Sequence, residues 1–158
     1  MTKAVQDMMV AVERTLDAFT AAVGAGDVDA ALALVTDDVT LTTLPAGLGA
    51  RGADAVRRHL AEDVLPHRPA DLTTTRVSRT GDRWRVVDEQ RVAFTHDREL
   101  PWLLPGVAAT GRRVEVLAIS VVSVRRERIT EHRTLWDHHG LLAQLGLLPA
   151  DVTVTADA

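Results

Sequence analysis

Three of the six histidines gather near the C-terminal end of the chain, and they are the first residues to consider for acid–base chemistry. His138 and His139 are adjacent at the start of a predicted helix, so their side chains point to different faces and do not form a bidentate metal site. His132 lies in a predicted strand, and its imidazole, with an ordinary pKa of about 6.5, can take up or release a proton near neutral pH. We therefore expect His132 to be a catalytic residue, the alternative being a hydrogen-bonded histidine in the core.

The strand predicted from Trp84 to Phe94 places a carboxylate, Asp88, among apolar neighbours. Side chains alternate across a strand, so Asp88 shares the inward face with Trp84 and Phe94. Such surroundings disfavour the charged carboxylate and raise its pKa toward values that suit proton transfer. We expect Asp88 to be the second catalytic residue, unless it pairs with an arginine or a bulge turns it outward.

The same alternation selects residues that we expect to contact a substrate. In the last predicted strand, the face that carries His132 also carries Thr134 and Trp136. The apolar loop from Leu100 to Leu104 contains Trp102, and it is interpreted as a lid over the pocket, a dimer contact or a loop packed on its own core. The contacts expected on these grounds are Gln90, Thr134, Trp136, Trp84, Phe94, His96 and Trp102.

The elements that must position these residues are helices first and strands afterwards. Apolar residues recur every three or four positions in the first part of the chain and then alternate, which is the change from a helical to a strand period. Helices are predicted over 5–23, 28–35, 53–65 and after Asp137, and strands over 39–44, 72–79, 84–94, 113–124 and 129–136. This order predicts an α+β domain in which helices cover one face of an antiparallel sheet.

Length and composition limit the kinds of protein that this chain can be. Its 158 residues are enough for one core, so we predict a single domain over 1–149 and a mobile tail over 150–158. The net charge of -4 and the lack of a basic cluster argue against nucleic-acid binding. The sequence has no cysteine, which fits the cytoplasm, and no apolar run long enough to span a membrane.

The end of the sequence resembles a known family. The segment Glu131-His132-Arg133-x-x-x-Asp137-x-x-Gly140-x-Leu142-x-Gln144-Leu145-Gly146 is similar to the ending of SnoaL-like polyketide cyclases of the nuclear-transport-factor-2-like (NTF2-like) superfamily. Further matches are Asp37-Asp38-Val39, Arg51-Gly52, Ala55-Val56 and Thr110-Gly111-Arg112. The resemblance implies an NTF2-like cone, with N-terminal helices packed on a curved sheet, a short C-terminal helix and a hydrophobic pocket open at one end.

The chain departs from these relatives at their catalytic positions. SnoaL-like cyclases have an aspartate at the position of Thr134 and a histidine at the position of Ser120. Hydroxyls are weak bases unless a neighbouring base activates them, so we expect Ser120 and Thr134 to contact substrate and His132 with Asp88 to transfer the proton. The limonene-epoxide-hydrolase branch uses an Asp-Arg-Asp set, of which only Arg91 has a match. Ketosteroid isomerases of this fold use a tyrosine, and the chain has none.

These considerations predict a cofactor-free, metal-free enzyme that cyclises, isomerises or dehydrates a hydrophobic polyketide-like or terpenoid-like substrate. An epoxide-opening enzyme of the limonene-epoxide-hydrolase type and a non-catalytic ligand-binding protein are the alternatives. We also expect the protein to be cytoplasmic and to form a homodimer. The dimer is expected because the outer face of the sheet would otherwise expose an apolar patch. The residues expected in that patch are Val87, Leu117, Ile119 and Val121.

Overall fold

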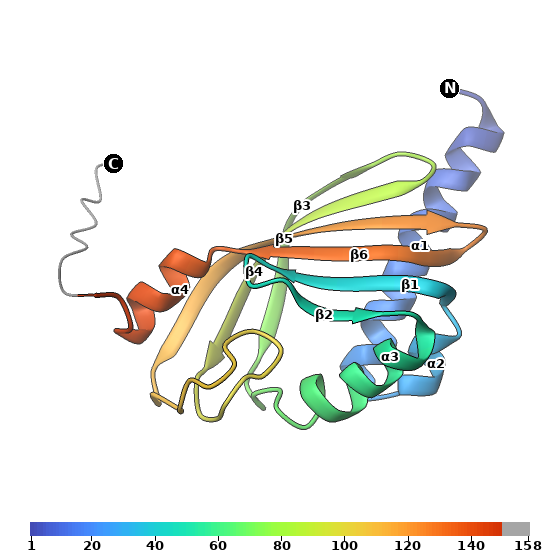
Figure 1. Ribbon diagram of the computed structural model, residues 1–158. Coiled ribbons are helices and arrows are strands. Elements are labelled where there is room, and N and C mark those ends of the chain that lie inside the picture. The colour runs from blue at the N-terminus through green and yellow to red at the C-terminus, as the bar shows by residue number, and fades with distance from the viewer. Residues whose placement is uncertain (150–158) are drawn as a thin grey trace.

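The computed structural model describes residues 1–149, and the tail predicted over 150–158 lies outside the described residues. Helices precede most of the strands, as the sequence predicts (Figure 1). The helices are α1 (Lys3–Ala25), α2 (Val28–Leu32), α3 (Ala53–Arg58), the π-helical segment η1 (His59–Val64) and α4 (His138–Leu145). The strands are β1 (Val35–Leu44), β2 (Leu48–Arg51), β3 (Thr73–Gly81), β4 (Arg85–Thr95), β5 (Arg113–Arg125) and β6 (Arg128–Trp136).

The strands form one curved sheet in the order β2-β1-β6-β5-β4-β3. Neighbouring strands run antiparallel except β1 and β6, which pair in parallel. The expectation of an antiparallel sheet is therefore wrong at this one pair. A parallel pair needs a long connection, and here the whole segment from β2 to β5 lies between the two strands. Figure 1 shows the sheet wrapping around α1, which confirms the predicted α+β cone.

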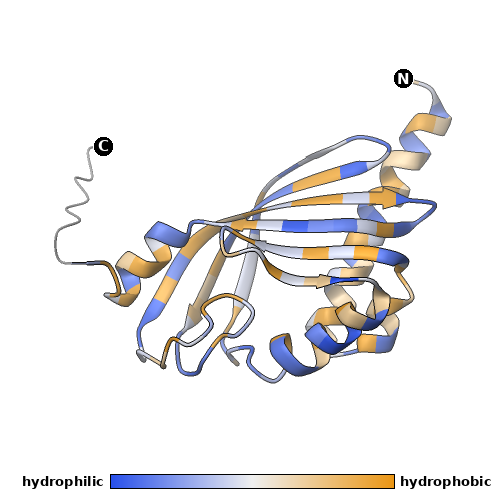
Figure 2. Ribbon diagram, viewed as in Figure 1, coloured by the Kyte–Doolittle hydropathy of each residue, from blue (hydrophilic) through white to orange (hydrophobic). Residues whose placement is uncertain are grey.

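The first helix packs its apolar stripe against the concave face of the sheet. Leu16 and Phe19 are almost completely buried, and they belong to a core cluster that includes Val86 and Val122 from the sheet. A second cluster joins Trp102 of the loop after β4 to the other end of the sheet and α4. Figure 2 shows apolar and polar residues alternating along the strands, which is the pattern of a sheet with one covered face.

Helix ends follow the capping residues that the sequence contains. The Asp27 side chain accepts a hydrogen bond from the Ala30 amide at 2.9 Å and begins α2. Asp137 accepts one from the Gly140 amide at 2.9 Å and begins α4, the helix that the sequence predicts after this residue. No helix within residues 1–149 is both long and apolar enough to cross a membrane.

Three features of the secondary structure differ from the prediction. Val35 begins a strand rather than ending a helix, because it is buried and pairs with Ile129. Residues 48–51, for which the sequence predicts no strand, form β2, which pairs antiparallel with β1. The third predicted helix changes from α-helical to π-helical at His59, and this change alters which side chains face the interior.

Candidate active site

A cavity of about 600 Å³ lies between the helices and the concave face of the sheet. Leu16 and Phe19 of α1 contribute to the helical wall, and Leu60 of η1 extends it. The sheet wall comes from β1, β4, β5 and β6, and the loop residue Trp102 adds an aromatic side. The lining is mostly apolar with a few polar groups, which is the usual character of a small-molecule site.

Six of the predicted site residues line this cavity. They are His132, Gln90, Ser120, Thr134, Trp136 and Trp102. The three from β6 follow one another on the inward face, at a spacing of two residues. Because a strand rises about 3.3 Å per residue, His132 and Trp136 lie about 13 Å apart along it. The sheet wall therefore presents an imidazole at one end, hydroxyls in the middle and an indole at the other end.

The hydroxyls come together because of strand register. Ser120 of β5 lies directly opposite Thr134 of β6, and Thr134 lies opposite Thr43 of β1. Opposite residues in neighbouring strands point to the same face of the sheet. The Ser120 Oγ and the Trp102 Nε1 are both buried and have no hydrogen-bond partner within residues 1–149. Polar groups left in this state are candidates to bind a ligand's polar atoms.

His132 is held in the wall without a polar partner. The edge of its ring meets Phe19 of α1, with ring centroids 5.8 Å apart, and neither ring nitrogen forms a hydrogen bond within residues 1–149. The His132 side chain is half-buried. It lines the cavity and is surrounded by protein atoms, which shield the ring from bulk water. This burial lowers the pKa of His132 to about 4, although the negative charge of Asp88 acts in the opposite direction. His132 is therefore neutral near pH 7 and can accept a proton.

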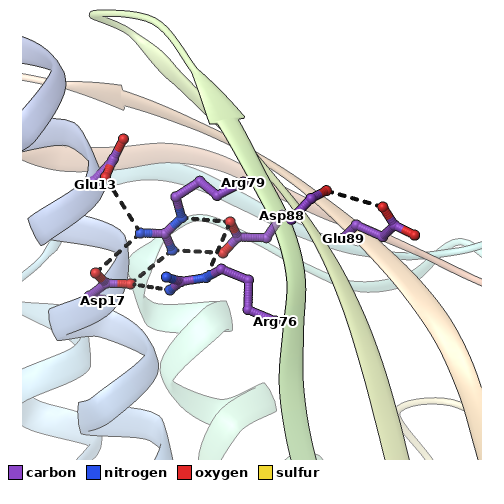
Figure 3. Close-up of polar contacts among 7 residues, drawn as sticks. Glu13, Asp17, Arg76, Arg79, Asp88 and Glu89 are labelled. Atoms are coloured by element: carbon purple, nitrogen blue, oxygen red, sulfur yellow. Dashed lines mark hydrogen bonds and ion pairs between the residues drawn. The ribbon is translucent and has the colours of Figure 1, made fainter.

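Asp88 lies outside the residues that line the cavity. It is 2% exposed, and both its oxygens are bound by Arg79, directly opposite on β3 (Figure 3). The Arg79 Nε lies 2.6 Å from Asp88 Oδ1, and Nη2 lies 2.7 Å from Oδ2. The expectation that Asp88 opens onto the same cavity as His132 is wrong, and the arginine pair named as the alternative is present. Catalysis by Asp88 stays a prediction that these contacts do not favour.

The same arginine ties the sheet to α1. Its guanidinium donates to both carboxylate oxygens of Asp17, at 2.8 and 3.2 Å, and Arg76 donates to Asp17 at 3.0 Å (Figure 3). The hydrogen bond from Arg79, assisted by the positive charges of Arg79 and Arg76, lowers the pKa of Asp17 despite its partial burial. The hydrogen bonds to Asp88 and Asp17 raise the pKa of Arg79 further above its usual value. The Asp17-Arg79-Asp88 set thus resembles an Asp-Arg-Asp triad in composition, but it braces the fold outside the cavity.

Three other predicted contacts do not line the cavity. Phe94 is completely buried in the second core cluster and does not reach the cavity. His96 is completely buried just after β4, where its Nδ1 lies 3.1 Å from the Thr110 Oγ1 across the base of the loop. Burial lowers the pKa of His96.

Trp84 contradicts the expected inward orientation. It is 54% exposed, and the Arg83 guanidinium lies 3.9 Å from the centre of its ring. It precedes β4 in a turn in which its amide donates to the Asp82 carboxylate, so the alternation of the strand does not extend to it.

His59 belongs to the site although it was not predicted from the sequence. This residue of η1 lines the cavity, and its Nδ1 lies 2.9 Å from the Asp63 Oδ2. The available signal was a histidine four residues before an aspartate in a predicted helix, a spacing at which side chains meet. That spacing is also common on helix surfaces, so the sequence did not single it out.

Comparisons with known proteins agree with this architecture. The model of the SnoaL-like domain family matches residues 16–132. A protein of Jannaschia sp. CCS1 named as a SnoaL-like polyketide cyclase superposes with a TM-score of 0.72 at 17% identity, covering 94% of this chain and 98% of that one. AclR of Streptomyces galilaeus, named as a hydroxylase, gives 0.67 at 24% identity, with coverage of 89% and 99%.

An LEH-like epoxide hydrolase of M. tuberculosis gives a TM-score of 0.62 at 20% identity, covering 85% of this chain and 88% of that one. No curated protein matches the chain in sequence. At these identities the solved structures establish the fold, and the differing activities in their names leave the reaction open.

The buried His132 predicts a specific dependence of stability on pH. Its pKa is about 4 in the folded protein and about 6.5 when unfolded, so between these values the unfolded chain binds a proton that the folded protein does not. The wild type should lose roughly 3 kcal/mol of unfolding free energy through this group as pH falls from about 7 to about 4. In urea denaturation, His132→Gln should lack this part of the loss. Equal pH dependence in the two proteins would contradict the burial of the ring.

The buried ion pair predicts a large loss of stability in Asp88→Ala. The substitution leaves the buried Arg79 guanidinium with the half-exposed Asp17 in place of its buried partner, and removal of one member of a buried pair costs about 3 kcal/mol or more. The matched control is Asp7→Ala, which breaks an exposed pair with Lys3 and should change stability by less than about 1 kcal/mol. Urea denaturation measures both. A loss in Asp88→Ala no larger than that of the control would show that the network does not brace the fold.

Proposed function

The chain belongs to the SnoaL-like domain family, and from this premise we propose that it is an enzyme that uses His132 as a general base on a hydrophobic, polyketide-like or terpenoid-like substrate. The observation that supports the proposal is the neutral imidazole of His132, which faces an apolar cavity of about 600 Å³ and has no hydrogen bond to protein within residues 1–149. A base shielded from water and free of protein partners is available to a substrate. The reaction uses no cofactor.

The order of groups along β6 fits a substrate with an apolar skeleton and a polar reactive end. The indoles of Trp136 and Trp102, whose ring centroids lie 5.9 Å apart, offer an apolar surface for fused or linear rings. The distance of about 13 Å from Trp136 to His132 accommodates two or three rings. His132 then removes a proton from carbon next to a carbonyl, while the hydroxyls of Ser120 and Thr134 orient the oxygen.

Proton removal at such a carbon is the first step shared by several reactions. Return of the proton at another carbon gives isomerisation, loss of a hydroxyl gives dehydration, and attack on a second carbonyl gives cyclisation. The similar solved structures are named as a cyclase, a hydroxylase and an epoxide hydrolase, so we specify only the proton transfer and leave the later step to the substrate.

A ligand-binding protein without turnover is the second candidate. It is favoured by the absence of any carboxylate among the residues within 1–149 that line the cavity, and by the hydroxyls of Ser120 and Thr134 at the family's catalytic positions. Epoxide opening is less favoured, because the Asp17-Arg79-Asp88 set lies outside the cavity. Incorporation of oxygen from labelled water into a product would identify epoxide hydrolysis.

The proposal includes a cytoplasmic homodimer. The absence of cysteine fits a reducing compartment. On the outer face of the sheet, Leu117 is 42% exposed, Ile119 40% and Leu135 50%. Ile119 and Leu135 lie opposite each other in neighbouring strands, so the patch is continuous. Such a patch is typical of an interface.

His132→Gln provides the test of the proposed chemistry. The probe is 2-tetralone, a bicyclic ketone whose carbon-bound protons next to the carbonyl exchange with D₂O when a base removes them. The wild type should accelerate deuterium incorporation, and His132→Gln should lower that rate by about 10²- to 10⁴-fold because glutamine does not titrate. The matched control is His139→Gln, which removes an exposed histidine outside the cavity. An unchanged rate in His132→Gln would contradict a catalytic role for His132.

Light scattering at micromolar concentration tests the dimer. The wild type should give about twice the chain mass of 17.1 kDa. Ile119→Glu places a charge at the centre of the outer patch and should give the mass of one chain. Met8→Glu alters an exposed apolar residue of α1 and should leave the dimer intact. A wild type of single-chain mass would refute the dimer.

A further inference from the structure

His59, which lines the cavity on its helical wall, forms a hydrogen-bonded pair with Asp63 beside it. The side chain of His59 is 10% exposed and lines the cavity, whereas that of Asp63 is 49% exposed. The carboxylate accepts the hydrogen of Nδ1 at a distance of 2.9 Å, which fixes the orientation of the ring. Nε2 has no hydrogen-bond partner within residues 1–149, and it is not one of the polar atoms sealed from solvent. One nitrogen is thus held by protein and the other remains free.

The π-helical segment explains why this histidine faces inward. In this segment and directly after it, the residues that line the pocket are His59, Leu60, Val64 and Leu65. This spacing of five residues matches the i to i+5 bonding of a π-helix, and the Leu65 amide donates to the Leu60 carbonyl at 3.0 Å. Asp63, four residues after His59, stays near enough to hold the ring while remaining half exposed. Single π-helical turns are frequent at functional sites.

The proposed proton transfer needs a second group that His132 does not supply. With a pKa of about 4, His132 is neutral near pH 7 and acts as a base rather than as an acid. No carboxylate lines the cavity within residues 1–149. Arg68 also lines it, but its guanidinium donates to the carbonyls of Val23 and Gly24 at 3.1 and 2.9 Å. His59 is the remaining titratable side chain of the cavity within this range.

We propose that His59 is a second catalytic residue, the general acid that protonates the substrate's carbonyl oxygen, and that Asp63 positions it. The inference rests on the proposed function, since it assumes a carbonyl substrate. His132 takes the proton from carbon, and the electrons of that bond form the carbon–carbon double bond. The carbonyl electron pair moves to oxygen, which takes a proton from Nε2 of His59 in its imidazolium form; His59 keeps the Nδ1 hydrogen bonded to Asp63 and is left neutral, and His132 is left protonated. The product is an enol, held between the sheet wall and the helical wall.

The charged neighbours of His59 are compatible with this role. Asp63 accepts from its Nδ1, and the same residue's backbone carbonyl lies 3.0 Å from the Nδ1 of His67. Arg68 follows in the same region, and its charge is directed toward the C-terminal end of α1. His67 does not line the cavity, so it shares the neighbourhood and the contact with Asp63 but not access to a ligand.

The test is deuterium exchange of 2-tetralone by four proteins across pH. The wild type should give a kcat/KM that falls on the acid side, where His132 takes up a proton. His59→Gln should lower kcat/KM at neutral pH by about 10²-fold, through kcat rather than through KM. Asp63→Asn should lower it by about tenfold, because the ring keeps a hydrogen-bond acceptor but loses the charge. The matched control, His67→Gln, should remain within about twofold of the wild type.

The outcomes separate this inference from the proposed function. A His59→Gln protein that is folded by circular dichroism and exchanges at the wild-type rate would overturn the role of His59. In that case the contact between His59 and Asp63 would contribute only to the stability of the helix. Lost exchange in His59→Gln with normal exchange in His132→Gln would overturn the proposed role of His132 and support that of His59.

Discussion

The position of α1 over the concave face of the sheet is the constraint on which the cavity depends. Apolar contacts of Leu16 and Phe19 hold the helix against the sheet, but such contacts are not directional. The Asp17-Arg79-Asp88 set adds direction, because a planar guanidinium binds two carboxylates in fixed geometry. Asp17 belongs to the helix and the other two to the sheet, so the ion pairs determine where the helical wall stands. The contact of Phe19 with His132 follows from that placement.

The cavity separates binding from chemistry along the sheet. Its aromatic end, at Trp136 and Trp102, has the surface to bury an apolar skeleton, and its other end holds an uncharged imidazole. The low pKa of His132 is a consequence of the same burial that makes the cavity suitable for apolar ligands. A weak base near pH 7 is still effective if a second group protonates the substrate's oxygen at the same time, and the helical wall supplies His59 in that position.

The sequence predicted the fold and the sheet wall well, because both depend on local patterns. Strand alternation placed Gln90, His132 and Trp136 correctly on the inward face, and capping residues identified the start of α4. Alternation failed for Trp84, which lies in the turn before β4, where no strand period applies. The position of Asp88 on the buried face was predicted correctly, but its partner depended on the register of β3 with β4, which no local pattern encodes.

His59 shows the same limit on the helical side. A helix was expected over 53–65, and no apolar period in the sequence marks the change to π-helical bonding at His59, where the side chain lines the cavity. Likewise, the parallel pairing of β1 with β6 depends on the course of the whole chain. Contacts of this kind between distant segments are the part of the site that sequence patterns leave undetermined.

The most direct test of the account is the titration of His132 itself, followed by NMR of protein with labelled histidine. A ring shielded from bulk water in the sheet wall should remain neutral until the pH falls to about 4. The addition of 2-tetralone at neutral pH should then shift the His132 ring resonances and leave those of His139 in place. Titration of His132 near 6.5, with no response to the ketone, would mean that the ring is open to water and would contradict its role as the base of an apolar pocket.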